Sequence, residues 1–144
     1  MRAVLGFSIL VVVALWAPRA GAQESHRFNA KALAAKYALP VFHQRAKVVN
    51  DEIVESTDDV THQKTGIYVV RAKAEKAVAF YTKALGEPKD ESTDTGVKKW
   101  IFKAADPRDS LTRHHVIVSY DKHSKQVQIM LWMRTYESAA DANF

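Results

Sequence analysis

The sequence contains no cysteine among its 144 residues. Disulfide bonds and thiolate-bound metals are therefore excluded, and the fold must depend on its packed core. Glycine and proline are scarce, with 5 and 4 residues, and no glycine-rich phosphate loop is present. There is also no G-x-S-x-G motif, so no serine has the setting of a nucleophile. These absences exclude phosphate-loop nucleotide binding and the serine-hydrolase elbow.

Long apolar runs are absent apart from one near the N-terminus. Residues 4–16 form an apolar run that follows Arg2 and is too short to span a membrane as a helix. The small residues after this run fit a peptidase cleavage site that ends at Ala22. We therefore predict a signal peptide over residues 1–22 and a single mature domain over residues 23–144, which is periplasmic or secreted. No second apolar run and no cysteine follow the cleavage site, so we expect no stable membrane anchor after cleavage.

The sequence has only a small excess of positive charge. Its formal net charge falls from +5 to +3 when Arg2 and Arg19 are removed with the signal peptide. Several basic residues lie near Trp100 and Phe102, and basic plus aromatic side chains can indicate nucleic-acid binding. These basic residues are Lys98, Lys99, Lys103, Arg108 and Arg113. With so modest a charge we interpret them as solvated strand edges and predict no nucleic-acid partner.

The rest of the chain is organised around residues 65–86, which predict a strand followed directly by an amphipathic helix. The strand is indicated by consecutive β-branched and aromatic residues from Ile67 to Val70. The helix is indicated by apolar residues at helical spacing, namely Ala74, Ala77, Val78, Tyr81 and Leu85. Gly86 supplies the C-terminal cap, and Pro88 cannot continue the helix. We expect Tyr81 to pack against the sheet, with its hydroxyl reaching a polar edge.

The remaining elements predict an α+β fold. Residues 24–38 indicate a short N-terminal helix, and residues 41–55 an extended segment or edge strand. The later segments are a polar loop (87–96), a strand (97–104), a hairpin (114–120 and 126–133) and a flexible tail (137–144). We predict a mostly antiparallel sheet of four or five strands, with one main helix packed on one face. The sheet and this helix are expected within residues 39–136.

Two groups of residues could suggest a metal site. The first is a group of carboxylates at Asp51, Glu52, Glu55, Asp58 and Asp59. The spacing and central glycine of a calcium loop are missing, so a charged edge that discourages strand pairing is the better interpretation. The second is the pair His114 and His115, whose side chains point to opposite faces of a strand and cannot share a metal. We predict no metal ligand, no catalytic residue and no cofactor.

Sequence motifs from the main helix and its surroundings resemble a group of small exported bacterial proteins of unknown function. The matching pieces occur in order: LPVF at 39–42, AKVV at 46–49, EKAVAFY and LG in the helix, and QVQIML in the last strand. Proteins of that group read LPVYPGAKVV, then a helix with a V-x-FY-x-x-x-LG core, then strands that end in T-Q-I-x-L. The resemblance implies an exported single domain and brings no known activity.

The same strand and helix, with the three strands that follow, also resemble one βαβββ module of the glyoxalase and vicinal-oxygen-chelate superfamily. When the two are aligned on Phe80 and Tyr81, the first metal-ligand position of that family falls on or near Gly66. Glycine offers no ligand, and residues 126–134 contain no carboxylate to match the terminal glutamate of the family. The resemblance therefore implies a local fold and does not supply the metal ligands.

The second face of the sheet is the main functional clue in the sequence. If the helix covers one face, the other carries Met130 and Trp132, which are unfavourable in contact with water. That face could be covered by the N-terminal helix, by a second subunit or partner protein, or by a small apolar ligand. We predict that it is a ligand or partner surface formed by His115, Ile117, Gln128, Met130 and Trp132.

These observations together predict a binding or protein-interaction module of the bacterial cell envelope. The expected partner is a second copy of the chain or another envelope protein. The basis is that no convergent acid, base, nucleophile or metal set is visible in the sequence. A divergent glyoxalase-like enzyme or a small-ligand-binding protein is the alternative.

Overall fold

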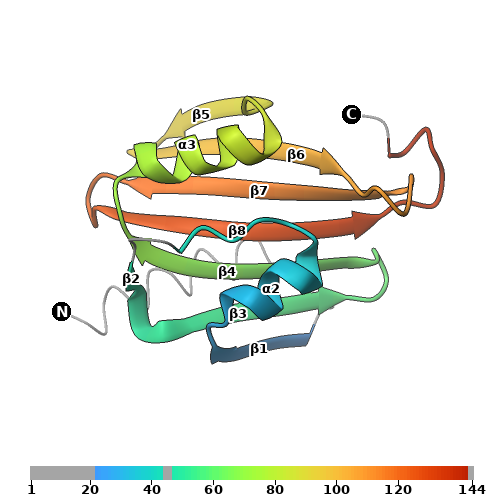
Figure 1. Cartoon of the computed structure of the whole chain (residues 1–144), viewed down its shortest axis with the longest axis horizontal. Coiled ribbons are helices and arrows are strands. Elements are labelled where there is room, and N and C mark those ends of the chain that lie inside the picture. Colours follow the sequence, from blue (N-terminus) through green and yellow to red (C-terminus); the bar gives the residue numbers. More distant parts are fainter. Residues whose placement is uncertain (1–21, 44–46, 143–144) are drawn as a thin grey trace.

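The structure, a computed structural model, describes residues 22–43 and 47–142. Within these residues the chain forms an eight-stranded antiparallel sheet in the order β1-β3-β4-β8-β7-β6-β5, with β2 paired to β4 (Figure 1). The first strands are β1 (Ala22–Arg27), β2 (Lys47–Val48), β3 (Glu52–Asp58) and β4 (Gln63–Arg71). They are followed by β5 (Asp90–Asp94), β6 (Val97–Ala105), β7 (Thr112–Asp121) and β8 (Gln126–Thr135).

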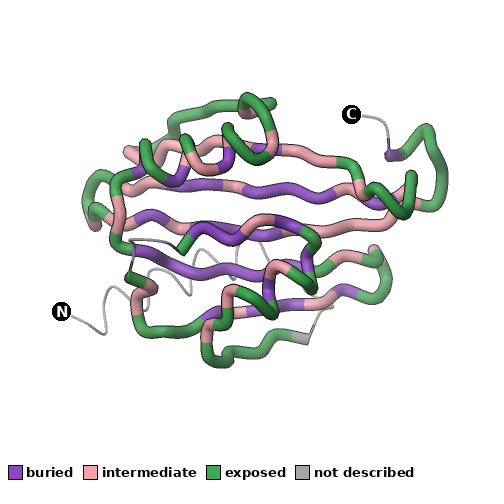
Figure 2. Tube along the Cα trace, in the orientation of Figure 1, coloured by how far each residue is buried: buried purple, intermediate pink, exposed green. Residues whose placement is uncertain are grey.

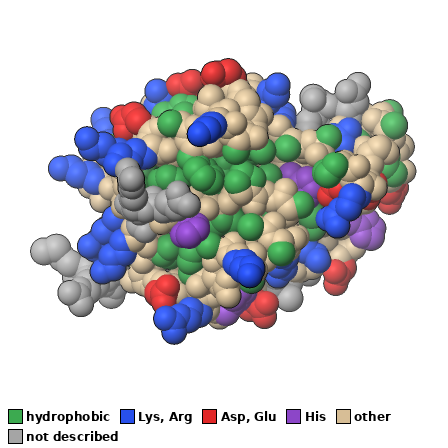
Figure 3. Space-filling view, viewed as in Figure 1, with side chains coloured by type: hydrophobic (Ala, Val, Ile, Leu, Met, Phe, Trp, Pro, Cys, Tyr) green, Lys and Arg blue, Asp and Glu red, His purple; other side chains and the backbone are tan. Residues whose placement is uncertain are grey.

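Two helices lie on the same face of this sheet. α3 (Ala74–Leu85) packs on β6 and β7, and α2 (Ala30–Tyr37) lies over the other half of the sheet (Figure 1). A short 3-10 turn, η1 (Val49–Asp51), connects β2 to β3. Hydrophobic side chains gather in the middle of this face, between the helices, and charged side chains surround them (Figure 3). We call this the helix face, and the opposite face of the sheet the second face.

The central strand and helix follow the sequence-based prediction. In α3 the buried residues are Ala74, Ala77 and Tyr81, which share one side of the helix. Gly86 ends the helix with φ of 89°, and its N–H donates to the carbonyl oxygen of Thr82 at 2.9 Å. This backbone conformation is accessible to glycine at little cost, which explains why the helix ends there.

Tyr81 is a core residue, as expected, and its hydroxyl has a specific partner. The side chain is fully buried, and the backbone N–H of Phe42 donates to its hydroxyl oxygen at 3.1 Å. The hydroxyl of Tyr68 donates in turn to the carbonyl oxygen of Phe42 at 3.0 Å. Two tyrosines therefore satisfy both backbone polar groups of Phe42, which lies in the segment between α2 and β2.

The three C-terminal strands also confirm their predicted faces. Trp100 and Phe102 of β6 point to the helix face, and Ile101 lies opposite Ile117 on the second face. Buried residues run along the central strands and the inner sides of the helices (Figure 2). The largest fully buried side chains are Tyr37, Tyr68, Tyr81, Phe102, Ile53, Ile129 and Leu131.

The predicted number of strands is wrong. The described residues form eight strands rather than four or five, and the sheet dominates the fold. β1 replaces the first part of the helix predicted over residues 24–38, and β5 replaces the polar loop predicted over residues 87–96. β3 lies between β1 and β4, so it is an internal strand and not the predicted edge.

The missed strands share a physical cause. All five residues of β5 are exposed, and so are residues 23–27 of β1. Because these edge strands bury no described apolar side chain, no alternation of apolar and polar residues marks them in the sequence. They form by main-chain pairing with β3 and β6. The true helix start is marked by Asn29, whose side chain accepts a hydrogen bond from the N–H of Ala32 at 3.0 Å.

The predicted signal peptide lies outside the described residues, except for Ala22 at the start of β1. No helix in the described part of the chain is long and apolar enough to cross a membrane. Near the other end of the chain, Ala142 is buried and its N–H donates to the carbonyl oxygen of Ser138 at 3.1 Å.

Candidate functional site

The second face carries a continuous apolar row that crosses neighbouring strands from β3 to β6. The ladder pairs Val54 with Ile67, Ile67 with Met130, Met130 with Ile117, and Ile117 with Ile101. Ile67 and Met130 are buried, and the flanking Val54 and Ile117 pack against them. Residues directly opposite one another in antiparallel strands are close enough for their side chains to touch. The row is therefore one surface feature, although its members are far apart in sequence.

A second row runs beside the first and contains an aromatic stack. Ladder pairs connect Thr65, Trp132, His115 and Lys103 in that order. The rings of His115 and Trp132 are stacked, with centroids 4.2 Å apart and an angle of 26° between their planes. Burial lowers the pKa of His115 to about 4, and the charges of Lys103 and His114 add to this effect. His115 is therefore neutral at pH 7.

The structure brings together all the residues that the sequence predicts for a ligand or partner surface. Ile117 and Met130 belong to the apolar row, and His115 and Trp132 to the row beside it. Gln128 lies on the other side, between Val69 and Ser119 in the ladder. One alternative for this face is wrong, because the N-terminal helix packs on the helix face through Leu33 and Tyr37.

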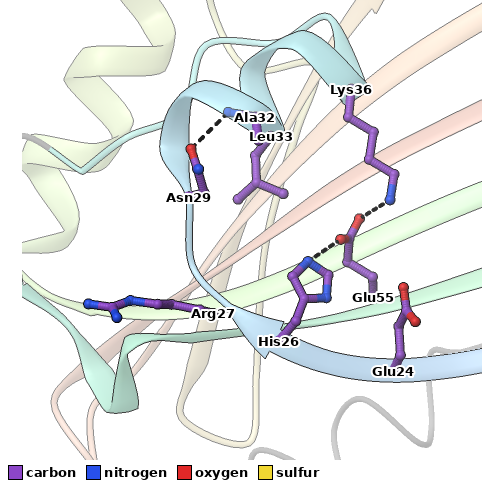
Figure 4. Close-up of a pocket in the computed structure, with 8 residues that line it drawn as sticks. All are labelled: Glu24, His26, Arg27, Asn29, Ala32, Leu33, Lys36 and Glu55. Carbon is purple, nitrogen blue, oxygen red and sulfur yellow. Dashed lines mark hydrogen bonds and ion pairs between the residues drawn. The ribbon is translucent and has the colours of Figure 1, made fainter.

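The helix face contains a feature that the sequence did not indicate, a buried carboxylate of one strand held by side chains of two other elements. Glu55 of β3 is only 4% exposed. Its Oε1 lies 2.7 Å from His26 Nε2 of β1, and its Oε2 lies 2.9 Å from Lys36 Nζ of α2 (Figure 4). The hydroxyl of Tyr37 also donates to Oε2. Glu55 therefore connects the edge strand and the first helix to the sheet.

The pKa values in this cluster follow from its geometry. Burial by itself would raise the pKa of Glu55, but hydrogen bonds from Tyr37 and Lys36 and the charges of Lys36 and His26 outweigh it and lower the pKa. Burial, followed by the hydrogen bond to Glu55 and its charge, raises the pKa of Tyr37 well above its usual range. Glu55 is thus an ionised carboxylate with satisfied partners, and Tyr37 is a permanent donor.

An open pocket lies beside Glu55, between β1 and α2. Its ionisable members are Glu24, His26, Arg27, Lys36 and Glu55, and it also contains Asn29, Ala32 and Leu33 (Figure 4). Asn29 is occupied by capping α2, and Leu33 forms the apolar wall. Glu55 is paired with His26 and Lys36, and Arg27 with Asp51 outside the pocket, so these groups offer no strong excess of one charge for a simple ion.

The acidic residues that the sequence places close together have separate roles. Asp51 pairs with Arg27 at 3.1 Å, and Glu55 belongs to the cluster described above. Asp58 closes the β3–β4 turn, where its Oδ1 accepts from the N–H groups of Val60 and Thr61 at 2.9 and 3.2 Å. No group of three or more His, Cys, Asp or Glu side chains suited to a metal ion occurs among the described residues.

The histidine pair separates as the strand geometry requires. The ring of His114 points to the helix face, is 1% exposed, and has its Nε2 2.8 Å from Asp106 Oδ2. His115 points to the second face, where it stacks on Trp132. The backbone N–H of Arg108 and the ring of His114 hold the pKa of Asp106 below its usual range. The contact between His114 and Asp106 anchors the β6–β7 loop to the core.

Neither a protein-family model, nor a curated protein, nor a solved structure matches this chain. The resemblances to small exported bacterial proteins and to the glyoxalase superfamily therefore remain predictions. Gly66, which falls on or near the first ligand position of the latter, lies opposite Glu55 in the β3–β4 ladder and beneath the ring of Tyr37. Its role in this chain is to make room for that tyrosine.

Proposed function

We propose that this protein is an exported binding module of the bacterial cell envelope, which uses the second face of its sheet to pair with a second copy of the chain. The single observation that supports this most is the apolar row on the second face. Both described helices pack on the helix face, so no described element lies over the row. Ile67 and Met130 at its centre are buried and the flanking Val54, Ile101 and Ile117 are half-buried. An apolar row rimmed by such partly exposed side chains can mark a contact surface.

The shape of the row favours a sheet as the partner. It crosses five neighbouring strands, which at about 4.8 Å per strand gives a width of roughly 19 Å. Ligands of small size prefer concave sites, whereas two sheets pack face to face at about 10 Å with interdigitated side chains. A broad row of side chains that crosses five antiparallel strands suits the second arrangement.

The order of residues in the row favours a second copy. Met130 lies at its centre on β8, with Ile67 on one side and Ile117 on the other. A two-fold axis parallel to β8 would place Met130 against its counterpart, and Ile67 of one copy against Ile117 of the other. Such an interface is self-complementary and closed, as in the commonest class of soluble oligomer.

The proposal is tested by measuring the molar mass of the protein purified from the envelope fraction of a bacterial host. Sedimentation velocity should give a dimer for the wild type and a monomer for Ile117→Glu, because a carboxylate would be buried without a partner. Glu75→Lys, on the exposed side of α3, should remain dimeric. A monomeric wild type would overturn the proposed pairing.

Metal analysis of the same preparation separates this proposal from a divergent glyoxalase-like enzyme. The binding module should contain no stoichiometric metal and show no lyase or dioxygenase turnover. A stoichiometric metal together with turnover would replace it with the enzyme function.

A further inference from the structure

Acidic side chains of β3 and of the preceding η1 contact three basic or polar side chains of β1, while Glu24 of β1 lies opposite Glu55 in the ladder. His26 Nε2 lies 2.7 Å from Glu55 Oε1, and Arg27 Nε lies 3.1 Å from Asp51 Oδ2. Ser25 donates from its hydroxyl to Glu52 at 3.3 Å. Charge complementarity is therefore part of how β1 recognises the edge of β3, in addition to the main-chain ladder.

β1 is attached to the sheet weakly by comparison with the central strands. It pairs with β3 alone, and residues 23–27 are all exposed. Detachment of β1 from β3 therefore breaks few buried apolar contacts. Segments of this kind have a low free energy of local unfolding. Its attachment to the core begins at Phe28, whose N–H donates to the carbonyl oxygen of Asp51 at 3.0 Å and whose ring lies 4.8 Å from that of Tyr68.

The core tolerates the loss of β1 because Glu55 keeps other partners. Removing one member of a buried ion pair is unfavourable when a charge is left alone. Here Lys36 Nζ remains 2.9 Å from Glu55 Oε2, and the hydroxyl of Tyr37 still donates to the same oxygen. The carboxylate is then paired both with β1 in place and with β1 detached.

We propose that β1 is an exchangeable edge strand, and that β3 accepts in its place an extended, basic segment of a partner polypeptide. An added strand gains its affinity from the main-chain ladder and its selectivity from alternate side chains. The incoming segment places a cationic side chain where His26 meets Glu55 and a second one where Arg27 meets Asp51. Glu55 of β3 and Asp51 of η1 are the selectivity elements of this edge, and Met130 at the centre of the apolar row lies two strands away, on β8.

The first test measures hydrogen exchange in the protein produced from the full chain. Amides of β1 that pair with β3 should exchange at least about tenfold faster than those of β4 and β8, because detachment of β1 needs no global unfolding. Equal protection of β1 and the central strands would overturn the proposal.

The second test measures binding of a fluorescent synthetic peptide with the sequence of residues 22–29, AQESHRFN, by anisotropy. This peptide should bind saturably, and a version with His26→Arg should bind more tightly because its cation does not depend on pH. A peptide with His26→Glu and Arg27→Glu should not bind. Absence of saturable binding, or equal binding of the charge-reversed peptide, would overturn the proposal.

Variants of the protein locate the peptide on the edge of β3. Asp51→Asn should remove most of the preference for the AQESHRFN peptide over a version with Arg27→Ala, because that preference depends on the ion pair between Arg27 and Asp51. The change is safe for folding, since the Asp51 side chain is 60% exposed. Ile117→Glu, on the second face, should leave peptide binding unchanged even if it abolishes dimer formation. This makes failure of strand exchange distinguishable from failure of the proposed dimer. An unchanged preference between these two peptides in the Asp51→Asn variant would place the peptide elsewhere and overturn the assignment to the edge of β3.

Discussion

Tyr37 lies directly over Gly66 of β4, where a side chain would collide with its hydroxyl. A Cβ atom at position 66 would lie 2.9 Å from the hydroxyl oxygen of Tyr37 and 3.1 Å from Cδ1 of Ile53. Gly66 pairs in the ladder with Glu55, the acceptor of the Tyr37 hydroxyl. The glycine, the tyrosine and the carboxylate therefore form one unit that fixes α2 on the sheet.

Gly66→Ala should lower the free energy of unfolding by about 1–3 kcal/mol, as expected for overpacking of a filled core. Urea denaturation followed by circular dichroism measures this change. In a Tyr37→Phe background the effect of Gly66→Ala should be smaller, because the nearest atom has been removed. A double-mutant cycle reports the coupling, expected at about 0.5–3 kcal/mol for residues in contact. An effect of Gly66→Ala below about 0.5 kcal/mol, typical of surface sites, would contradict this account.

Tyr81→Ala should lower the free energy of unfolding by about 3–5 kcal/mol, since a large aromatic side chain is removed from the core. Tyr81→Phe should have a smaller effect of about 1–3 kcal/mol, because the buried N–H of Phe42 loses its acceptor. Chemical denaturation of both variants checks that Tyr81→Ala lowers the free energy of unfolding more than Tyr81→Phe. Glu75→Ala serves as an exposed control on the same helix. If Tyr81→Phe had the same free energy of unfolding as the wild type, the hydrogen bond from the N–H of Phe42 would make no net contribution to stability.

The pKa of His115 makes stability depend on pH in a defined window. Its pKa is about 4 in the folded protein and 6.5 as the reference value for the unfolded chain. Between these values the unfolded state binds a proton that the folded state does not, so stability falls as the pH is lowered through this range. The loss should reach about 3 kcal/mol near pH 4.

His115→Phe isolates this effect because phenylalanine can stack on Trp132 and does not titrate. The free energy of unfolding of the variant should change less than that of the wild type between pH 7 and about pH 4.5. Carboxylates with lowered pKa, such as Glu55, lose their contribution at still lower pH, so they affect both proteins alike. If the free energies of unfolding of the two proteins changed in parallel with pH, His115 would have the same pKa in the folded and unfolded states.

Cleavage after Ala22 should give a mature protein that begins at Gln23. Intact mass spectrometry of protein from the envelope fraction checks this, and Ala22→Leu should block or shift the cleavage because the site requires a small residue. Ala22 is the first residue of β1, and Gln23 pairs with Ser56. Recovery of the chain with Met1 intact in the membrane fraction would contradict the predicted export and processing.

Sequence periodicity was sufficient to predict the type and the buried side of α3 and of the C-terminal strands, since each buries one side in the core. Tyr81 and Ala77 repeat at helical spacing, and Val116 and Val118 alternate along a strand, because each set must face the core. The same reasoning correctly separated Ile101 from Phe102 and placed Met130 and Trp132 on a common face. Local patterns therefore determined α3, the C-terminal strands and their side of the second face, whereas Val54 and Ile67 joined that face only through strand pairing.

Tertiary structure alone decided the features that depend on pairing between distant segments. β1 and β5 bury no described apolar side chain, so only the edges of β3 and β6 make them strands. In the sequence, Glu55 is one of several neighbouring carboxylates, and nothing distinguishes it from a surface residue. Its burial depends on Lys36 and Tyr37 from α2 and His26 from β1. A charge can be buried only where its partners converge, and that convergence is set by the register of the sheet and the position of the helix.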